Sequence, residues 1–312
     1  MLLNRSSLHT PFALRDKFFD LDFTLFFSIL LLGIISIFAQ YSSSGGQFDY
    51  HSKSHAIRFF VFFLFFLVIS FVNIRFWNDY SLLIFILLIL LLVAVKFFGV
   101  QSQGSRRWIN VFVFNLQPSE LMKVGIILFL SNYYHKISSG DVNKFRYLFY
   151  PLIALLIPFM LVLTQPDLGT AILILISGIV VTWLSGVRWK IFAYLSVFSI
   201  CLAPIAISFL KPYQKSRILT FLNPDSDPLG AGYQIIQSKI AIGSGGLFGK
   251  GFLNGSQAYL NFLPEKHTDF IFTLFSEEFG FLGSVSIIFL YFLITFRITR
   301  IGNMTRSIFG KL

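Results

Sequence analysis

Charged side chains and cysteine are both scarce in this sequence. Only 12% of its 312 residues are Asp, Glu, Lys or Arg, against about 25% in a soluble domain. A water-soluble enzyme is therefore excluded, and the 55% hydrophobic content excludes a disordered protein. The single cysteine, Cys201, excludes an intrachain disulfide framework.

Hydrophobic residues, by contrast, are abundant and clustered. They include 41 Phe and form runs of roughly 17–25 residues, the length at which a helix crosses a hydrocarbon layer. We predict an all-α, polytopic helical membrane protein with about eight transmembrane helices. The expected spans are residues 22–39, 57–73, 81–98, 119–134, 148–164, 168–186, 191–210 and 270–296. No small-residue cleavage pattern follows the first span, so it is not a cleavable signal peptide.

The positions of Lys and Arg predict that the N-terminus lies in the cytoplasm. In that orientation thirteen of them fall in the inner segments and five in the short outer ones, as the positive-inside rule requires. The net charge of +11 is thus mostly a topology signal, and no nucleic-acid partner is expected. The expected regions are a cytoplasmic segment 1–21, a seven-helix membrane region 22–210, an extracytoplasmic loop 211–269, an eighth helix 270–296 and a cytoplasmic tail 297–312.

The long outer loop is rich in glycine, with eight Gly between residues 230 and 255. Glycine at this density permits tight turns and close approach of the backbone to a ligand. Residues 233–240 place apolar side chains about one helical turn apart, which predicts a short helix in the membrane interface. The Ile, Leu and Phe content of the loop argues against disorder, so we expect it to be functional.

Charged residues in or beside the spans gather in the outer half of the membrane. Placing a charged side chain in the bilayer costs roughly 2.5–3.5 kcal/mol on insertion scales, so we expect each one to have a structural or functional role. One interpretation is structural: the charges pair, cap helices or reach lipid headgroups. The residues concerned are Glu120 with Lys123 as an ion pair, Asp167 and Thr268 or Asp269 as helix caps, Glu277 with Glu278 as struts, and Arg106 with Arg107 as headgroup contacts.

The other interpretation is a single site that opens outward. Its basic groups would bind an anionic lipid headgroup such as a pyrophosphate. Its carboxylates would supply a base or ligands for a hard divalent cation, and the glycine-rich loop would cover the site. The basic residues in this interpretation are Arg58, Arg106, Arg107 and Lys123. His267 by itself is weak evidence for a metal site, because no second ligand is evident.

Several strings in the sequence are more specific than these arguments. They are residues 104–109, 117–123, 165–171, 221–224, 227–234, 237–247, 263–272 and 277–280. In order and spacing they resemble the SEDS family of bacterial cell-wall polymerases (RodA, FtsW and SpoVE), over roughly residues 20–295. The stretches 227–233 and 244–251 are more similar to the elongation branch (RodA) than to the division branch. The family usually has ten spans, and this sequence ends after the eighth.

The resemblance implies a peptidoglycan glycosyltransferase of the bacterial cytoplasmic membrane. Family members polymerise lipid II into glycan strands at the outer face during growth, releasing undecaprenyl pyrophosphate, and work with a class B penicillin-binding protein. The implied catalytic residue is Asp269, in the loop 211–269. The substrate-binding residues that it implies are Arg58, Trp108, Glu120, Lys123 and Asp167. Arg106, Arg107 and His267, in the same strings, are further candidates for substrate binding.

The mechanism expected from this resemblance needs one carboxylate base. Asp269 would take the proton from the acceptor hydroxyl, and basic groups, with or without Mg²⁺ or Mn²⁺, would hold the pyrophosphate. No organic cofactor is expected. Two alternatives stay open: a lipid II transporter, which needs polar groups along the whole path, and a non-catalytic scaffold for the penicillin-binding protein.

Overall fold

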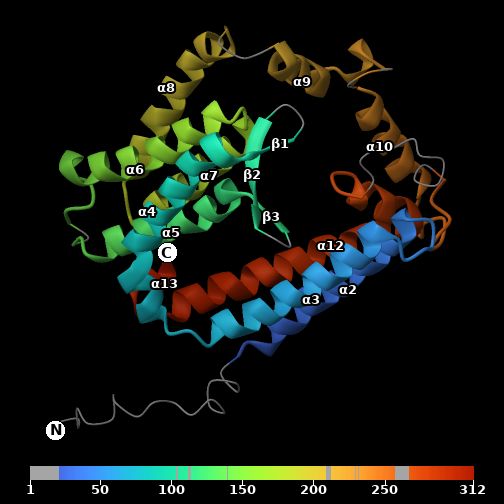
Figure 1. Ribbon diagram of the computed structural model, residues 1–312, viewed down its shortest axis with the longest axis horizontal. Coiled ribbons are helices and arrows are strands. Elements are labelled where there is room, and N and C mark those ends of the chain that lie inside the picture. Colours follow the sequence, from blue (N-terminus) through green and yellow to red (C-terminus); the bar gives the residue numbers. More distant parts are fainter. Residues whose placement is uncertain are drawn as a thin grey trace. The chain divides into compact units, whose positions relative to one another are not determined.

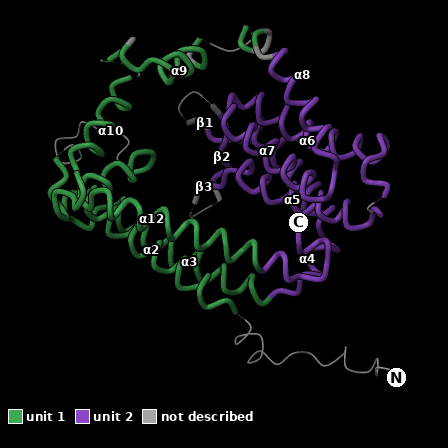
Figure 2. Tube along the Cα trace, turned by 180° about the vertical axis from the view of Figure 1, so that it is seen from behind, with its two compact units in different colours: residues 1–71, 204–300 green, residues 72–203, 301–312 purple. Residues whose placement is uncertain are grey.

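The computed structural model describes residues 21–102, 105–111, 114–138, 140–208, 212–228, 230, 232–256 and 267–312. The chain divides into two compact units (Figure 2). Unit 1 comprises Met1–Phe71 with Pro204–Arg300, and unit 2 comprises Val72–Ala203 with Ile301–Leu312.

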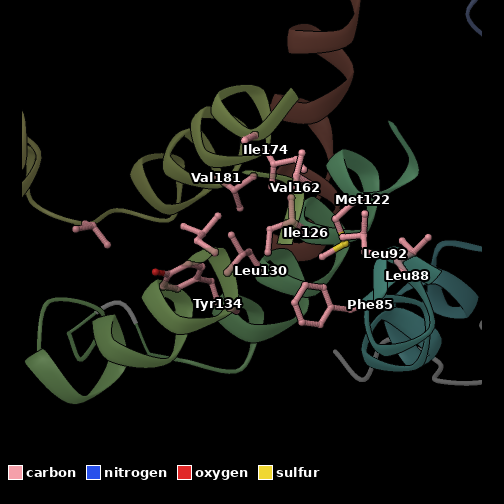
Figure 3. Packing of buried hydrophobic residues seen from close by; sticks show 14 of the residues in the cluster. Phe85, Leu88, Leu92, Met122, Ile126, Leu130, Tyr134, Val162, Ile174 and Val181 are labelled. Carbon is pink, nitrogen blue, oxygen red and sulfur yellow. The ribbon is translucent and has the colours of Figure 1, made fainter. Parts of the chain in front are cut away.

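Unit 2 is a helical bundle around α5. Its helices are α4 (Ile74–Phe98), α5 (Pro118–His135), α6 (Phe145–Thr164), α7 (Leu168–Leu184), most of α8 (Trp189–Ser208), and the short α13 (Ile308–Lys311). Met122, Ile126 and Leu130 recur every four residues along α5, and all three are fully buried. Figure 3 shows them packed against Leu92 of α4 and Ile174 of α7. This apolar core is continuous, and its close packing supports the site residues of unit 2.

A small antiparallel sheet links α4 to α5. It consists of β1 (Val100–Ser102), β2 (Ser105–Val111) and β3 (Phe114–Leu116), in the order β1-β2-β3. In the register, Gln101 pairs with Arg106 and Asn110 with Asn115. The sequence analysis did not predict these strands, because they are short and carry little alternation of apolar and polar residues.

Unit 1 is built on α2 (Phe23–Ser43), α3 (Tyr50–Ser70) and α12 (Ile271–Met304). Figure 1 shows these helices side by side, α2 and α3 in blue and α12 in red. Apolar side chains of α2, including Ala39, pack on Phe275 and Ile287 of α12. The rest of the unit includes α9 (Pro212–Leu222), the short 3₁₀-helix η2 (Pro224–Ser226) and α10 (Tyr233–Ser244).

Polar contacts at two levels show that α2 and α12 run antiparallel. Asp22, the N-cap of α2, accepts hydrogen bonds from Arg297 Nε at 2.9 and 3.2 Å. Near the other end of α2, Ser42 Oγ donates to Glu278 Oε1 of α12. A separation of about 20 helical residues corresponds to about 30 Å, the thickness of a hydrocarbon layer. The two polar levels therefore match the two boundaries of a membrane.

The predicted all-α fold class is confirmed, since a helix occupies each of the eight predicted hydrophobic segments where they are described. Within the described ranges, five helices are long and apolar enough to cross a membrane: α2, α3, α4, α6 and α12. The number of spans stays a prediction, because α7 and the described part of α8 give shorter apolar stretches. The helix predicted over 233–240 is present as α10 and continues to Ser244. The eighth helix continues beyond residue 296, to Met304.

Candidate functional site

Strand β2 separates neighbouring side chains of the Arg-Arg-Trp string onto opposite faces. Successive residues of a strand point to alternate sides, and the exposure follows this alternation. Arg106, Trp108 and Asn110 are exposed, whereas Arg107 and Ile109 are half-buried. Arg106 and Trp108 therefore share the open face of the strand, and Arg107 points to the covered one.

Arg107 joins the sheet to the turn between α6 and α7. Its Nε donates to the Gln165 carbonyl at 3.0 Å, and a terminal nitrogen donates to the Pro166 carbonyl at 2.6 Å. A second terminal nitrogen lies 3.6 Å from Asp167 Oδ2. Because the guanidinium is planar and offers several donors, it holds three successive residues of the turn in one arrangement.

Asp167 is the N-cap of α7, as one of the sequence interpretations expected. Its Oδ1 accepts from the backbone N–H of Thr170 at 3.1 Å. Its Oδ2 also accepts from Gln117 Nε2 at 3.2 Å, which links the turn to the start of α5. The Asp167 carboxylate thus accepts hydrogen bonds from the N-cap of α5 and from α7, and forms an ion pair with Arg107 of β2.

Glu120 and Lys123 form the ion pair expected from their i,i+3 spacing. Lys123 Nζ lies 2.8 Å from Glu120 Oε2. The Glu120 side chain is 52% exposed, however, so the pair is open on one side. Such an exposed pair contributes little to the stability of the fold. Because the pair is open to its surroundings, a ligand could contact both groups.

The predicted site residues of unit 1 are Arg58, His267 and Asp269. Arg58 is exposed and donates to Ser54 Oγ on its own helix, with Nε at 3.0 Å. Asp269 is exposed in the turn before α12 and makes no hydrogen bond or ion pair with any residue that the structure describes. A carboxylate without a partner keeps its oxygens free to accept a proton.

His267, two residues before Asp269, is tied to the end of α2 and the start of α3. Its Nδ1 is hydrogen-bonded to Ser43 Oγ at 2.8 Å, and its carbonyl accepts from Gln40 Nε2. Its ring stacks on that of His51, with the centroids 4.7 Å apart and the planes 11° from parallel. The sequence analysis missed Gln40, Ser43 and His51. The polar string that follows the first apolar run, Gln40 to Ser44, was the available signal.

Glu277 and Glu278 are both buried, with 0% and 2% of their surfaces exposed. They do not pair as struts with each other. Glu277 instead accepts from Lys250 Nζ at 2.6 Å and from Ser256 Oγ at 2.9 Å, and Glu278 accepts from Ser42 of α2. Adjacent residues of a helix point about 100° apart, so the two carboxylates reach different elements.

The glycine-rich segment 246–251 inserts its backbone into a break in α12. The helix leaves helical geometry at Gly280, where φ is +65°. There the N–H groups of Lys250 and Gly251 donate to the Glu277 and Glu278 carbonyls, each at 3.0 Å. On the other side of the break, the N–H groups of Phe281 and Leu282 donate to the carbonyls of Gly246 and Leu247. The backbone groups freed by the break are therefore satisfied by the loop.

No metal ligands can be assigned from this arrangement. Among the described residues, no three His, Cys, Asp or Glu side chains lie close enough together to hold a metal ion. A divalent cation, Mg²⁺ or Mn²⁺, stays a prediction. Of the predicted site residues, unit 2 holds Arg106, Arg107, Trp108, Glu120, Lys123 and Asp167, and unit 1 holds Arg58, His267 and Asp269.

Known proteins are similar to this chain in sequence and in fold. A family model described as "Cell cycle protein" (FtsW/RodA/SpoVE) matches residues 19–312. The chain is 37% identical over 305 residues to Escherichia coli K12 "Peptidoglycan glycosyltransferase MrdB", covering 96% of this chain and 81% of that protein. It is 40% identical over 266 residues to "Probable peptidoglycan glycosyltransferase FtsW" of Buchnera aphidicola subsp. Schizaphis graminum, covering 83% and 74%.

Solved structures show the same fold. One is described as "Structural coordination of polymerization and crosslinking by a peptidoglycan synthase complex", with a TM-score of 0.77 and 24% identity over 93% of this chain and 80% of that one. The other is the Thermus thermophilus rod shape determining protein RodA, with a TM-score of 0.64 and 22% identity over 93% and 79%.

Proposed function

Since the chain belongs to the FtsW/RodA/SpoVE family of cell cycle proteins, we propose that it is a peptidoglycan glycosyltransferase that polymerises lipid II. Relatives at 37% and 40% identity carry the name of this activity. The reaction would take place at the outer face of the bacterial cytoplasmic membrane during elongation and release undecaprenyl pyrophosphate. The protein is a multi-pass membrane protein, and its excess of inner Lys and Arg supports a cytoplasmic N-terminus.

The observation that carries the proposal is the state of Asp269. This carboxylate is exposed and has no partner among the described residues, while the chain two residues earlier is anchored through His267. A general base needs both properties: its oxygens must be free, and its backbone must hold it in position.

In the proposed step, Asp269 accepts the proton of the attacking sugar 4-hydroxyl. The hydroxyl oxygen forms a bond to the anomeric carbon of the donor. The bond from that carbon to the phosphate oxygen breaks, and its electron pair leaves with the undecaprenyl pyrophosphate. Inversion at this carbon converts an α-linked donor into a β-linked polymer. Exclusion of water protects the step, because water would compete as nucleophile.

The open face of β2 suits the sugar and phosphate parts of the donor. Arg106 is exposed and supplies a guanidinium for phosphate oxygens, and Trp108, which is 36% exposed, offers a ring face for a sugar. Glu120 and Lys123, in the same unit as β2, provide further polar groups for this ligand. Arg107 and Asp167 act through the turn that they hold, rather than by direct contact.

The partner proposed for this protein is a class B penicillin-binding protein, which would crosslink the new strands. The likeness in fold to a peptidoglycan synthase complex supports this proposal. Lipid II, the nascent glycan strand and membrane lipids complete the expected contacts.

The test is polymerisation of lipid II by purified protein, with and without the penicillin-binding partner. Asp269→Asn should abolish polymer formation while leaving expression unchanged. Asp141→Asn, at a half-buried acid that pairs with Lys144 in the loop between α5 and α6, is the control and should keep full activity. Full polymerisation by Asp269→Asn would rule out the base role. A protein inactive in every assay that still supports its partner would indicate a scaffold.

A further inference from the structure

The corner between α2 and α3 (residues 40–52) forms a polar cluster directly beside the segment that carries Asp269. Three of its side chains contact His267: Ser43 by a hydrogen bond to Nδ1, Gln40 by a hydrogen bond to the carbonyl, and His51 by ring stacking. These residues are more than 200 positions apart from His267 in sequence. Only the fold brings them together.

The corner is rigid in itself. Gln40, Ser43 and Ser52 are buried, with 8%, 1% and 0% of their surfaces exposed. The Gln40 carbonyl accepts from Ser43 Oγ at 2.8 Å and from Ser52 Oγ at 3.1 Å. Ser44 and Ser52 share a further hydrogen bond of 2.9 Å. Buried polar groups that satisfy one another in this way hold a single arrangement.

Contacts with His267 are not needed to hold α2 against α12. The two helices are already joined by the Asp22–Arg297 ion pair at one end and by Ser42 and Glu278 at the other. Apolar packing that includes Ala39 of α2 and Ile287 of α12 lies between these contacts. The contacts with His267 act instead on the short stretch before α12, residues 267–270, which includes Asp269.

We propose that the corner between α2 and α3 positions Asp269 for catalysis, with Gln40, Ser43 and His51 as positioning residues. This inference rests on the proposed function. Gln40 contacts the backbone carbonyl of His267, Ser43 its ring nitrogen and His51 its ring face. These three contacts define both the path and the orientation of the chain two residues before the Asp269 carboxylate. A displacement of about 1 Å at a catalytic group can cost about 100-fold in rate.

The experiment compares two variants that each remove one contact with His267. His51→Ala removes the stacked ring from an exposed position, and Gln40→Met removes the donor while keeping the volume. Lys53→Ala, exposed on the same turn of α3, is the matched control. Three readouts are taken on the full-length protein: kcat and KM for lipid II, amide hydrogen exchange of residues 267–270, and the thermal unfolding temperature.

The expected result for both variants is a kcat lower by about 10- to 100-fold, with KM and unfolding temperature close to those of Lys53→Ala. Exchange at 267–270 should rise. His51→Phe, which restores a flat ring, should return kcat to within about threefold of the parent protein.

Unchanged exchange at 267–270, or unchanged kcat, would overturn the positioning role. An unfolding temperature that falls together with kcat and is not restored by His51→Phe would do so too, since it indicates a general structural role. Failure of the proposed function can be distinguished from failure of this inference. If the proposed function is wrong, Asp269→Asn retains activity. The exchange measurement still reports whether the corner holds residues 267–270.

Discussion

Lys250 and Glu277 form an ion pair of 2.6 Å in which the Glu277 side chain is wholly buried and the Lys250 side chain is 30% exposed. The pair links the glycine-rich segment to α12 close to the break at Gly280. Ser256 Oγ donates to the same carboxylate oxygen of Glu277. A buried charge that loses its partner is strongly destabilising, whereas removal of both charges is much less so.

Lys250→Met should therefore lower the free energy of unfolding by about 3 kcal/mol, because the buried Glu277 carboxylate would lose the Lys250 ammonium. The double variant Lys250→Met/Glu277→Gln should recover most of this loss. Thermal and denaturant unfolding in detergent measure both effects. Lys144→Met, which breaks the exposed Asp141–Lys144 pair, should cause little change. Equal losses in the single and double variants would contradict the expected coupling.

Arg106 and Arg107 should respond differently to the same substitution. Arg107→Lys loses the planar fork that holds three residues of the α6–α7 turn, so we expect a lower unfolding temperature together with lower activity. Arg106→Lys should leave the unfolding temperature unchanged and raise KM for lipid II several-fold, because only ligand contacts are altered. The pattern is checked by calorimetry and steady-state kinetics. A reversed pattern would show that the faces of β2 are assigned wrongly.

Gly249 should not tolerate a side chain. Its φ is +82°, and a Cβ at this position would lie 2.0 Å from the Glu278 carbonyl oxygen. Gly249→Ala should destabilise the protein by more than 1 kcal/mol, since the loop would be pushed out of the α12 break. Gly243→Ala is the control: it lies in α10 with open space around it, and should be neutral or stabilising by about 0.5–1 kcal/mol. Unfolding midpoints of the two variants test the difference.

Asp49 should make the start of α3 sensitive to strong acid. A hydrogen bond from the backbone N–H of Ser52 lowers the pKa of this N-cap carboxyl from 3.8 to about 2. A lowered pKa means that the stabilisation is present above pH 3.8 and is lost as the pH falls toward 2. The unfolding temperature of Asp49→Ala should therefore lie below that of the parent protein at pH 6 and approach it near pH 2. A difference that does not change with pH would contradict this assignment.

The sequence predicted candidate residues for the site but not the contacts that they make. Residue strings pointed to Asp269, Arg106, Trp108 and Lys123, and the i,i+3 spacing predicted the Glu120–Lys123 pair that is observed. The roles of neighbours could not be predicted, because they depend on which face of an element meets another. The side chains of Arg106 and Arg107 point to opposite faces because β2 is a strand. The alternation of apolar and polar residues in β2 is too weak for the strand to be recognised from the sequence.

The amino-acid sequence alone determined that this protein is a helical membrane protein, where its helices lie and, through its residue strings, to which family it belongs. These properties follow from local patterns: runs of apolar residues long enough to cross a bilayer and short strings of fixed spacing. Only the tertiary structure decided that His267 meets Ser43 and His51, that Glu277 binds Lys250, and that the segment 246–251 fills the break in α12. Contacts between residues so distant along the chain arise from the packing of whole helices, which no local pattern encodes.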